Sequence, residues 1–184
     1  KEQLNQIKQL KTENALKRRA KEFQEKLASL KFLDPACGSG NFLTETYLSL
    51  RKLENEAIKL QITDNNVLLD TDQKLIKVSI QQFYGIEIND FAVSVAKTAL
   101  WIAESQMLEE TKSIVYANWD FLPLKTYTHI HEGNALRMDW NDVLPSNECS
   151  YIMGNPPFIG ARLQTKEQKR DLANILVQYK NLCK

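Results

Sequence analysis

Four short runs with strand character alternate with longer helical patterns along this 184-residue chain. The runs fall near residues 32–34, 83–88, 128–131 and 150–154, and each passes into polar, glycine or proline residues. Strands that alternate with helices pair in parallel through right-handed crossover connections. The pattern therefore predicts an α/β fold with a parallel sheet, in which ligands bind at the carboxyl edge.

The segments between these runs have helical character. Helices are expected from residue 42 to 60, from 90 to about 109 and from 166 to 182, and a helical segment over residues 1–30 is expected to pack on the sheet. In the helix that begins at residue 90, the side chains expected to face the sheet are Phe91, Val95, Ala99, Ile102 and Met107. Residues 63–78 have the pattern of an insertion that contains a small β-hairpin.

The first apolar run ends in a carboxylate, Asp34, and a turn of small residues with two glycines follows it. Gly38 and Gly40 allow the backbone to approach a ligand, and a helix that opens near Asn41 directs its free amides toward the same space. The turn lacks the Lys-Ser/Thr ending of a phosphate loop and the spacing of the dinucleotide fingerprint. Because Asp34 repels phosphate and attracts ammonium, the turn suits a ligand with a cationic amino-acid part, and S-adenosylmethionine fits that description.

Polar residues also end the second and third runs. Glu87 is the candidate ligand for two ribose hydroxyls, because an acid at the end of the second strand commonly accepts them in nucleotide-binding α/β folds. The alternative for Glu87 is a solvated charge or a helix cap, and Asp90 suits the capping role better because it directly precedes a helical pattern. Asn134 would lie at the next strand end, within reach of a bound adenine ring.

The last run leads into an amide, two prolines and an aromatic residue, Asn155-Pro156-Pro157-Phe158. The Asn155 side-chain oxygen and the Pro156 carbonyl can both accept hydrogen bonds from one planar exocyclic amine, and Phe158 can stack on the ring that carries this amine. The same four residues also suit a strand that ends in a proline turn, with Phe158 in the core. The residues alone leave both interpretations open.

In this order, the four strand-end motifs resemble those of the amino-group, adenine-specific DNA methyltransferases. The stretch from about Phe32 to Asp171 is most similar to the MmeI-like branch of restriction-modification enzymes. This resemblance implies a Rossmann-like fold of the S-adenosylmethionine-dependent methyltransferases, with a partial sheet of about four strands in the order 3-2-1-4, flanking helices and an N-terminal helix.

The resemblance also assigns the site residues. The cofactor-binding residues are Asp34, Pro35, Ala36, Gly38, Gly40, Asn41, Phe42, Glu87, Ile88, Asn134 and Ala135. The catalytic residues are Asn155, Pro156, Pro157 and Phe158. The implied reaction transfers a methyl group from S-adenosylmethionine to the N6 amine of an adenine flipped out of double-stranded DNA.

The resemblance further implies that this chain is part of a larger enzyme. Residues 1–30 are expected to form an N-terminal helical segment, and residues 31–184 the N-terminal part of a methyltransferase catalytic domain. A target-recognition domain and an endonuclease domain would lie elsewhere in the parent chain. Two alternatives stay open: a methyltransferase for protein glutamine or ribosomal RNA guanine, and a folded fragment that is inactive without the rest of its protein.

Charge and composition limit the other classes of function. The formal net charge is only +1, but basic residues cluster at 17–21 and again beyond the proline motif, at Arg162, Lys166, Lys169 and Arg170. The first cluster is expected to be a solvated helix face, and the second is placed to meet a DNA backbone. The three cysteines lack metal-ligand spacing, so no metal site is expected, and Cys37 is expected to be a buried loop residue. No run approaches the length of a membrane span, and a cytoplasmic location is expected.

Overall fold

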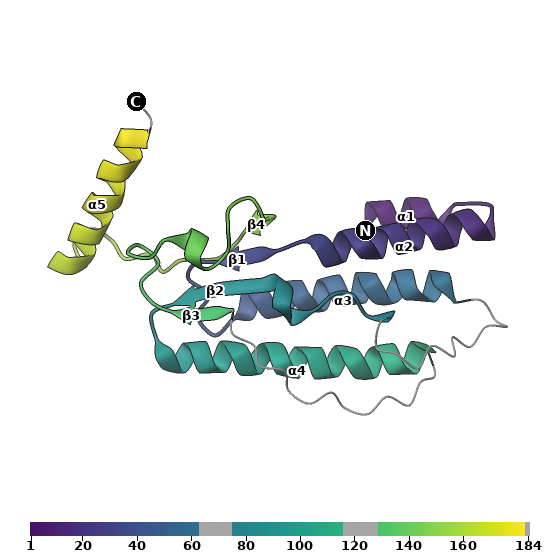
Figure 1. The fold of residues 1–184 in the computed structure, drawn as a ribbon. Coiled ribbons are helices and arrows are strands. Elements are labelled where there is room, and N and C mark those ends of the chain that lie inside the picture. Colours follow the sequence, from purple (N-terminus) through teal and green to yellow (C-terminus); the bar gives the residue numbers. More distant parts are fainter. Residues whose placement is uncertain (63–74, 116–128, 183–184) are drawn as a thin grey trace.

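A parallel sheet of four strands lies at the centre of the fold. The computed structural model describes residues 1–62, 75–115 and 129–182 (Figure 1). The strands are β1 (Phe32–Asp34), β2 (Phe83–Glu87), β3 (Ile130–Glu132) and β4 (Tyr151–Ile152), in the spatial order β3-β2-β1-β4. All three strand pairs are parallel. The predicted α/β class and the strand order 3-2-1-4 are confirmed.

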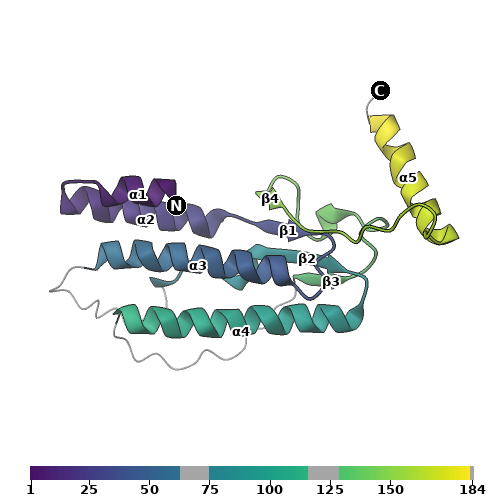
Figure 2. The same cartoon turned by 180° about the vertical axis from the view of Figure 1, so that it is seen from behind.

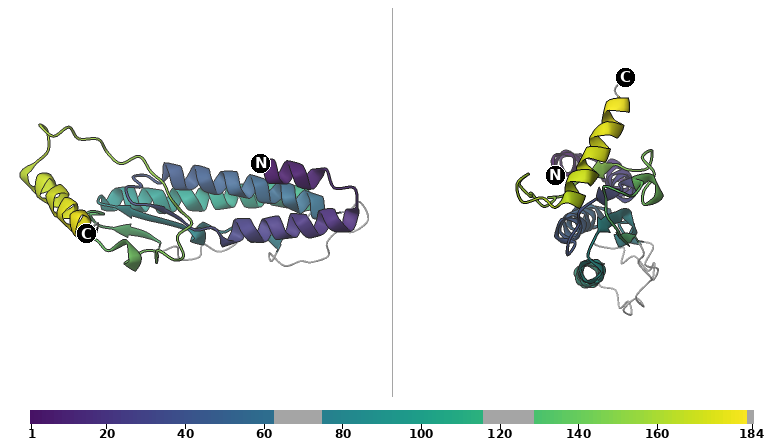
Figure 3. Two further views of the ribbon diagram at one scale, coloured as in Figure 1. Left: turned by 90° about the horizontal axis from the view of Figure 1, so that it is seen from above. Right: turned by 90° about the vertical axis from the view of Figure 1, so that its left-hand side faces the viewer.

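Helices connect the strands and cover the sheet. They are α1 (Glu2–Lys8), α2 (Glu13–Ser29), α3 (Asn41–Gln61), α4 (Asp90–Val115) and α5 (Lys166–Leu182), with short 3-10 helices η2 (Ile80–Gln82) and η3 (Trp140–Asp142). Figures 1 and 2 show α2, α3 and α4 running alongside one another and extending past the amino ends of the strands. Helix α5 stands at the opposite end, beyond the carboxyl edge of the sheet, as the left view of Figure 3 also shows.

Aromatic rings fix the register of the central strands. Phe32 of β1 pairs with Phe83 of β2 on one side and with Tyr151 of β4 on the other. Its ring stacks on both neighbours, at centroid distances of 5.1 Å and 5.4 Å. Because a slip of one residue would move each ring to the opposite face of the sheet, this stack helps to hold β1, β2 and β4 in register.

The N-terminal helices pack differently from the prediction. Helices α1 and α2 pack on α3 rather than on the sheet, and Leu4, Phe23 and Leu27 are buried in the core that α3 shares. The reason is length: α2 has 17 residues, whereas β1 has three. A helix of that length spans about 25 Å and a three-residue strand about 10 Å, so only another helix can cover it.

The buried face of α4 also differs from the prediction. Of the five residues expected to face the sheet, Met107 is buried, but Phe91 and Ile102 are 74% and 54% exposed. The buried stripe instead begins with Val93, Ala96, Leu100, Ala103 and Met107. This stripe places Ala96 against the glycine turn before α3, because a helix can approach closely only at small side chains: a Cβ added to Gly40 would lie 2.9 Å from the Ala96 Cβ.

Two local predictions need correction. Helix α4 begins at Asp90, so the N-cap position belongs to Asn89, whose Oδ1 accepts from the Ala92 amide (3.0 Å). Asp90 also accepts within the first turn, through its Oδ1 from the Phe91 amide (2.6 Å). Of the hairpin expected within residues 63–78, residues 63–74 lie outside the described part, and residues 75–78 form no strand. The amides of Lys77 and Val78 donate to the Glu54 carboxylate instead of to a partner strand.

That carboxylate belongs to a buried polar network, which sequence patterns do not indicate. Arg51 and Glu54 of α3 are 1% and 0% exposed and form an ion pair. Arg51 also donates to the Thr111 hydroxyl of α4 (2.7 Å), and Glu54 accepts from the Gln24 amide of α2 (2.8 Å). The network therefore joins three helices through a pair of charges that are hydrogen-bonded on several sides.

Candidate active site

The carboxyl ends of β1 and β4 bring two distant parts of the chain into contact. Asp34, the last residue of β1, is 1% exposed, and Gly154 follows β4 closely. A Cβ added to Gly154 would lie 2.5 Å from the Asp34 Oδ1 atom, and Gly154 has a φ of 151°. Only glycine fits here, because any side chain would overlap the carboxylate and strain the backbone.

The Asp34 carboxylate has one free oxygen. Its Oδ1 atom accepts a hydrogen bond from the Ala36 amide (3.0 Å), whereas the buried Oδ2 atom has no partner among the described residues. Burial raises the pKa of this carboxyl above its ordinary value, and the negative charge of Glu87 raises it further. A buried acceptor without a donor is unfavourable, so this site favours a ligand that brings a donor and a positive charge.

The glycine turn after β1 is held by Glu87 at the end of β2. The Gly38 amide donates to Glu87 Oε2 (2.8 Å), and the Asn89 amide donates to Glu87 Oε1 (3.0 Å). Gly38 and Gly40 have φ values of 54° and 79°, and a Cβ on Gly38 would meet nothing within 4 Å. A carboxylate has about four acceptor positions, so Glu87 retains capacity for two hydroxyl donors.

Asn134 lies just after β3 and has partners at both ends of its amide. Its Oδ1 accepts from the Leu136 amide (2.9 Å), which closes a local turn. Its Nδ2 donates to Asp171 Oδ2 of α5 (3.1 Å), a residue that the sequence prediction did not include in the site. The only sequence signal for Asp171 is an acid that directly follows two basic residues, and charge alone does not place it.

The other predicted cofactor residues flank this edge. Phe42 and Ile88 are 50% and 68% exposed, so both offer apolar surface beside the turn. Asn41 is exposed at the first position of α3, whereas Pro35, Ala36 and Ala135 are half-buried. The four strand-end motifs therefore share one edge of the sheet.

The proline motif lies in an extended segment between β4 and α5. Asn155, Pro156, Pro157 and Phe158 are all exposed, and the Phe158 side chain is fully exposed. The alternative that placed Phe158 in a core is therefore wrong for the part of the chain that the structure describes. The amide oxygen and the aromatic ring are both accessible to a ligand.

Cysteine and histidine residues near this edge have structural surroundings. Burial, followed by the charges of Asp34 and Glu87, raises the pKa of the buried Cys37 thiol to about 12, which is far too high for a nucleophile at neutral pH. The His129 ring stacks on Tyr84 at 4.4 Å, and its Nδ1 lies 2.9 Å from the Gln81 carbonyl oxygen. The buried thiol agrees with the role expected for Cys37, and the contacts of His129 give this residue a structural role as well.

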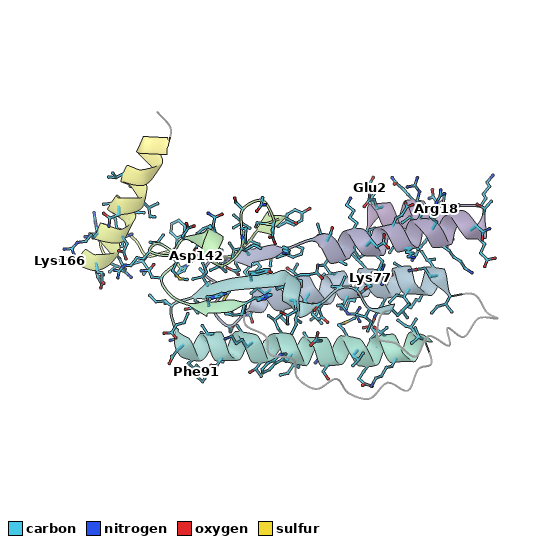
Figure 4. All side chains as sticks on the ribbon, in the orientation of Figure 1. Glu2, Arg18, Lys77, Phe91, Asp142 and Lys166 are labelled. Carbon is cyan, nitrogen blue, oxygen red and sulfur yellow. The ribbon has the colours of Figure 1, made fainter. Side chains whose placement is uncertain are left out.

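The two basic clusters have different surroundings, and the first is the solvated helix face that was expected. Lys17 and Arg19 form ion pairs with Glu13 and Glu22 on the exposed face of α2. The second cluster follows the proline motif, and all four of its residues are exposed. Lys166 lies at the end of the molecule remote from Arg18 (Figure 4).

Within the described ranges, no group of His, Cys, Asp or Glu could hold a metal ion, and no helix is long and apolar enough to cross a membrane.

Comparison with known proteins decides the family. The family model of the MmeI DNA-methyltransferase domain matches residues 8–184. The chain belongs to the MmeI DNA-methyltransferase domain family. A solved structure of the Type IIL restriction-modification enzyme MmeI in complex with DNA superimposes with a TM-score of 0.81 and 42% identity, over 87% of this chain and 21% of that one. The predicted methyltransferase-like fold and the MmeI-like resemblance are thereby confirmed.

Relatives of this MmeI-family domain are longer proteins. DNA methyltransferase A of Bacillus subtilis is 47% identical over 160 residues, which are 85% of this chain and 18% of that protein. Adenine-specific methyltransferase PglX of Streptomyces coelicolor is 32% identical over 74 residues, which are 40% of this chain and 5% of that protein. The domain thus spans about a fifth or less of the length of each of these proteins.

Proposed function

We propose that this domain transfers a methyl group from S-adenosylmethionine to the N6 amine of adenine in DNA, as part of a restriction-modification enzyme. The contact between Asp34 and Gly154 carries the proposal, because it joins the turn suited to a cationic cofactor directly to the motif suited to an exocyclic amine. Family membership and the printed names of the relatives support DNA as the substrate, and PglX supports adenine.

The proposed cofactor site uses the carboxyl edge of three strands. S-adenosylmethionine, when bound, supplies an electrophilic methyl group on a sulfonium. The free Oδ2 of Asp34 would accept from its ammonium group, and Glu87 would accept from the ribose hydroxyls. The exposed side chains of Phe42 and Ile88 offer apolar surface for the adenine ring, with Asn134 at the ring edge. Pro35, Ala36, Asn41 and Ala135 would line the same space.

The proposed acceptor site needs no strong base. The Asn155 side-chain oxygen and the Pro156 carbonyl would both accept from the target amine, so its lone pair can turn toward the methyl group. Phe158 is exposed and free to stack on the target ring, and Pro157 restricts the backbone between the two. Cys37 is unsuited to act as a covalent nucleophile, because a thiol with a pKa of about 12 is protonated at neutral pH.

The proposed partner is double-stranded DNA with one adenine flipped out of the helix. The exposed residues Arg162, Lys166, Lys169 and Arg170 would meet the phosphate backbone next to that base. Sequence recognition and DNA cleavage would belong to a target-recognition domain and an endonuclease domain of the parent protein. We place this activity in the cytoplasm. We assign residues 31–184 to the N-terminal part of the catalytic domain and residues 1–30 to an N-terminal helical segment.

Product analysis tests this proposal. The full-length protein is incubated with methyl-labelled S-adenosylmethionine and unmodified plasmid, and the DNA is digested to nucleosides. Label is expected in N6-methyl-2′-deoxyadenosine, and the Asn155→Ala variant should lose transfer while it keeps its cofactor affinity. Asn174→Ala, an exposed asparagine on α5, serves as the matched control. Label in N4-methyl-2′-deoxycytidine would refute adenine as the target. Label only in protein glutamine or in ribosomal RNA guanine, when protein and ribosomal RNA are offered in parallel incubations, would refute DNA as the substrate.

Residues 1–184 alone are expected to bind the cofactor without methylating DNA. The reason is exposure: Phe158 is fully exposed and Tyr151 and Ile152 of the edge strand are 56% and 62% exposed, so the target pocket lacks walls within the described part of the chain. Calorimetric titration of this fragment should give heat of binding with S-adenosylmethionine, whereas the plasmid assay should give no label. DNA methylation by the fragment would contradict this expectation.

A further inference from the structure

Asp171 is unusual among the residues of α5. It is 7% exposed, and it is the only buried residue between positions 166 and 177. The helix that contains it stands away from the sheet (Figure 1) and exposes Leu172, Leu176 and Val177. The first turns of α5 are therefore attached to the body through a carboxylate rather than through apolar packing.

Two groups near β3 donate hydrogen bonds to this carboxylate. Asn134 Nδ2 lies 3.1 Å from Asp171 Oδ2, and Arg137 Nε lies 2.9 Å from Asp171 Oδ1. Arg137 lowers the pKa of the Asp171 carboxyl, with a further contribution from Asn134, so the group stays ionised at neutral pH. Arg137 also pairs with Glu167, one turn earlier on α5 (2.7 Å).

An ionised carboxylate fixes the orientation of the Asn134 amide. A carboxylate only accepts hydrogen bonds, so the amine end of the amide must face Asp171. The oxygen end must then face the Leu136 amide, which donates to it at 2.9 Å. If the Asn134 amide were flipped, its oxygen would face the Asp171 carboxylate and its NH₂ group would face the Leu136 N–H. Both hydrogen bonds would then be lost together.

We propose that Asp171 is a positioning residue for cofactor binding, which acts by fixing the acceptor that Asn134 presents at the carboxyl edge of the sheet. The inference rests on the proposed function, in which Asn134 contacts the adenine ring of S-adenosylmethionine. A second lone pair on the Asn134 oxygen remains for the exocyclic amine of that ring. Without Asp171 the amide is free to turn, and part of the population presents a donor where the ring needs an acceptor.

The position of Asp171 links the cofactor to the acceptor motif. Residues 155–165 connect the two contacts, since Gly154 packs on Asp34 before this segment and Asp171 bonds Asn134 after it. Both ends of the segment that carries Asn155 are thus attached to cofactor residues. Because linkage is reciprocal, cofactor binding and the order of this segment favour each other.

A double-mutant cycle on cofactor affinity tests the inference. Calorimetry measures binding of S-adenosylmethionine to the full-length protein and to the variants Asp171→Asn, Asn134→Ala and their combination. Loss of one oriented hydrogen bond is worth about 1 kcal/mol, so Asp171→Asn should weaken binding roughly fivefold. The double variant should bind no more weakly than Asn134→Ala alone. Glu167→Gln is the matched control, because it removes another carboxylate beside Arg137 without touching Asn134, and its affinity should be that of wild type.

Thermal unfolding separates positioning from folding. Asp171→Asn is isosteric, and its unfolding midpoint should match that of Glu167→Gln. Equal cofactor affinity of Asp171→Asn and wild type would overturn the inference alone, as would additive losses in the double variant. A wild-type protein that binds no S-adenosylmethionine would overturn the proposed function and this inference with it.

Discussion

Substitution of Gly154 by alanine is expected to damage the acceptor site through the buried Asp34. The new Cβ would lie 2.5 Å from Asp34 Oδ1 and 3.1 Å from its Cγ. The carboxylate cannot turn away freely, because Oδ1 accepts from the Ala36 amide and the side chain is 1% exposed. The chain at residue 154 must therefore move, and it carries Asn155 with it.

The size of the effect follows from this overlap. A methyl group at 2.5 Å must shift by about 1 Å to reach a favourable separation near ~3.5 Å. Overpacking of this kind costs about 1–3 kcal/mol, and a side chain at a φ of 151° adds about 1–3 kcal/mol. Since a displacement of about 1 Å in a catalytic group lowers rates roughly 100-fold, we expect kcat to fall by about that factor.

Three glycines in this chain provide a graded control. Gly160→Ala has no φ strain and no atom within 4 Å of the new Cβ, whereas Gly38→Ala has a φ of 54° but equally open space. Methyl-transfer rates and denaturant unfolding are measured for all three alanine variants of the full-length protein. The loss should be smallest at Gly160, intermediate at Gly38 and largest at Gly154. A Gly154→Ala variant that performed as Gly160→Ala does would refute the proposed contact between the two motifs.

Three further predictions concern the core and the site. Arg51→Met should destabilise the fold by about 3–5 kcal/mol in urea unfolding, because it leaves Glu54 buried without its cation; a loss below about 1 kcal/mol would contradict this. Burial raises the pKa of Asp34 above its ordinary value of 3.8, so the folded state binds the proton more tightly than the unfolded state does. The free energy of unfolding therefore falls as pH rises from the unfolded-state pKa through the higher folded-state pKa. Asp34→Asn should therefore be more stable than wild type at pH 7, and the difference should shrink as pH falls; a constant difference would show that titration is not its origin. Cys37, with a pKa of about 12, should resist alkylation at pH 8 in the folded protein while the half-buried Cys149 reacts, as peptide mapping can show.

Local sequence patterns predicted the elements that local chemistry controls. The strand ends at Asp34 and Glu87 and the turn at Gly38 and Gly40 were predictable, because each combines an apolar run, a polar end and a glycine within a few residues. The buried face of α4 could not be predicted in this way. Hydrophobicity favours large side chains such as Phe91 on a buried face, whereas close approach to Gly40 selects Ala96. The N-terminal helices were misplaced because a sequence does not show how little of a helix three-residue strands can cover.

The chemical group at each strand end can be read from the order of residues alone: an acid at Asp34, another at Glu87, an amide at Asn134 and the Asn155 motif. Which of these groups come into contact depends on how the folded chain packs. Parallel pairing of β1 with β4 brings Gly154 onto Asp34, and the return of α5 brings Asp171 to Asn134. Such contacts depend on how segments that are distant in the sequence pack against one another. The periodicity within one segment does not encode this packing, because a local pattern indicates only which face the element buries.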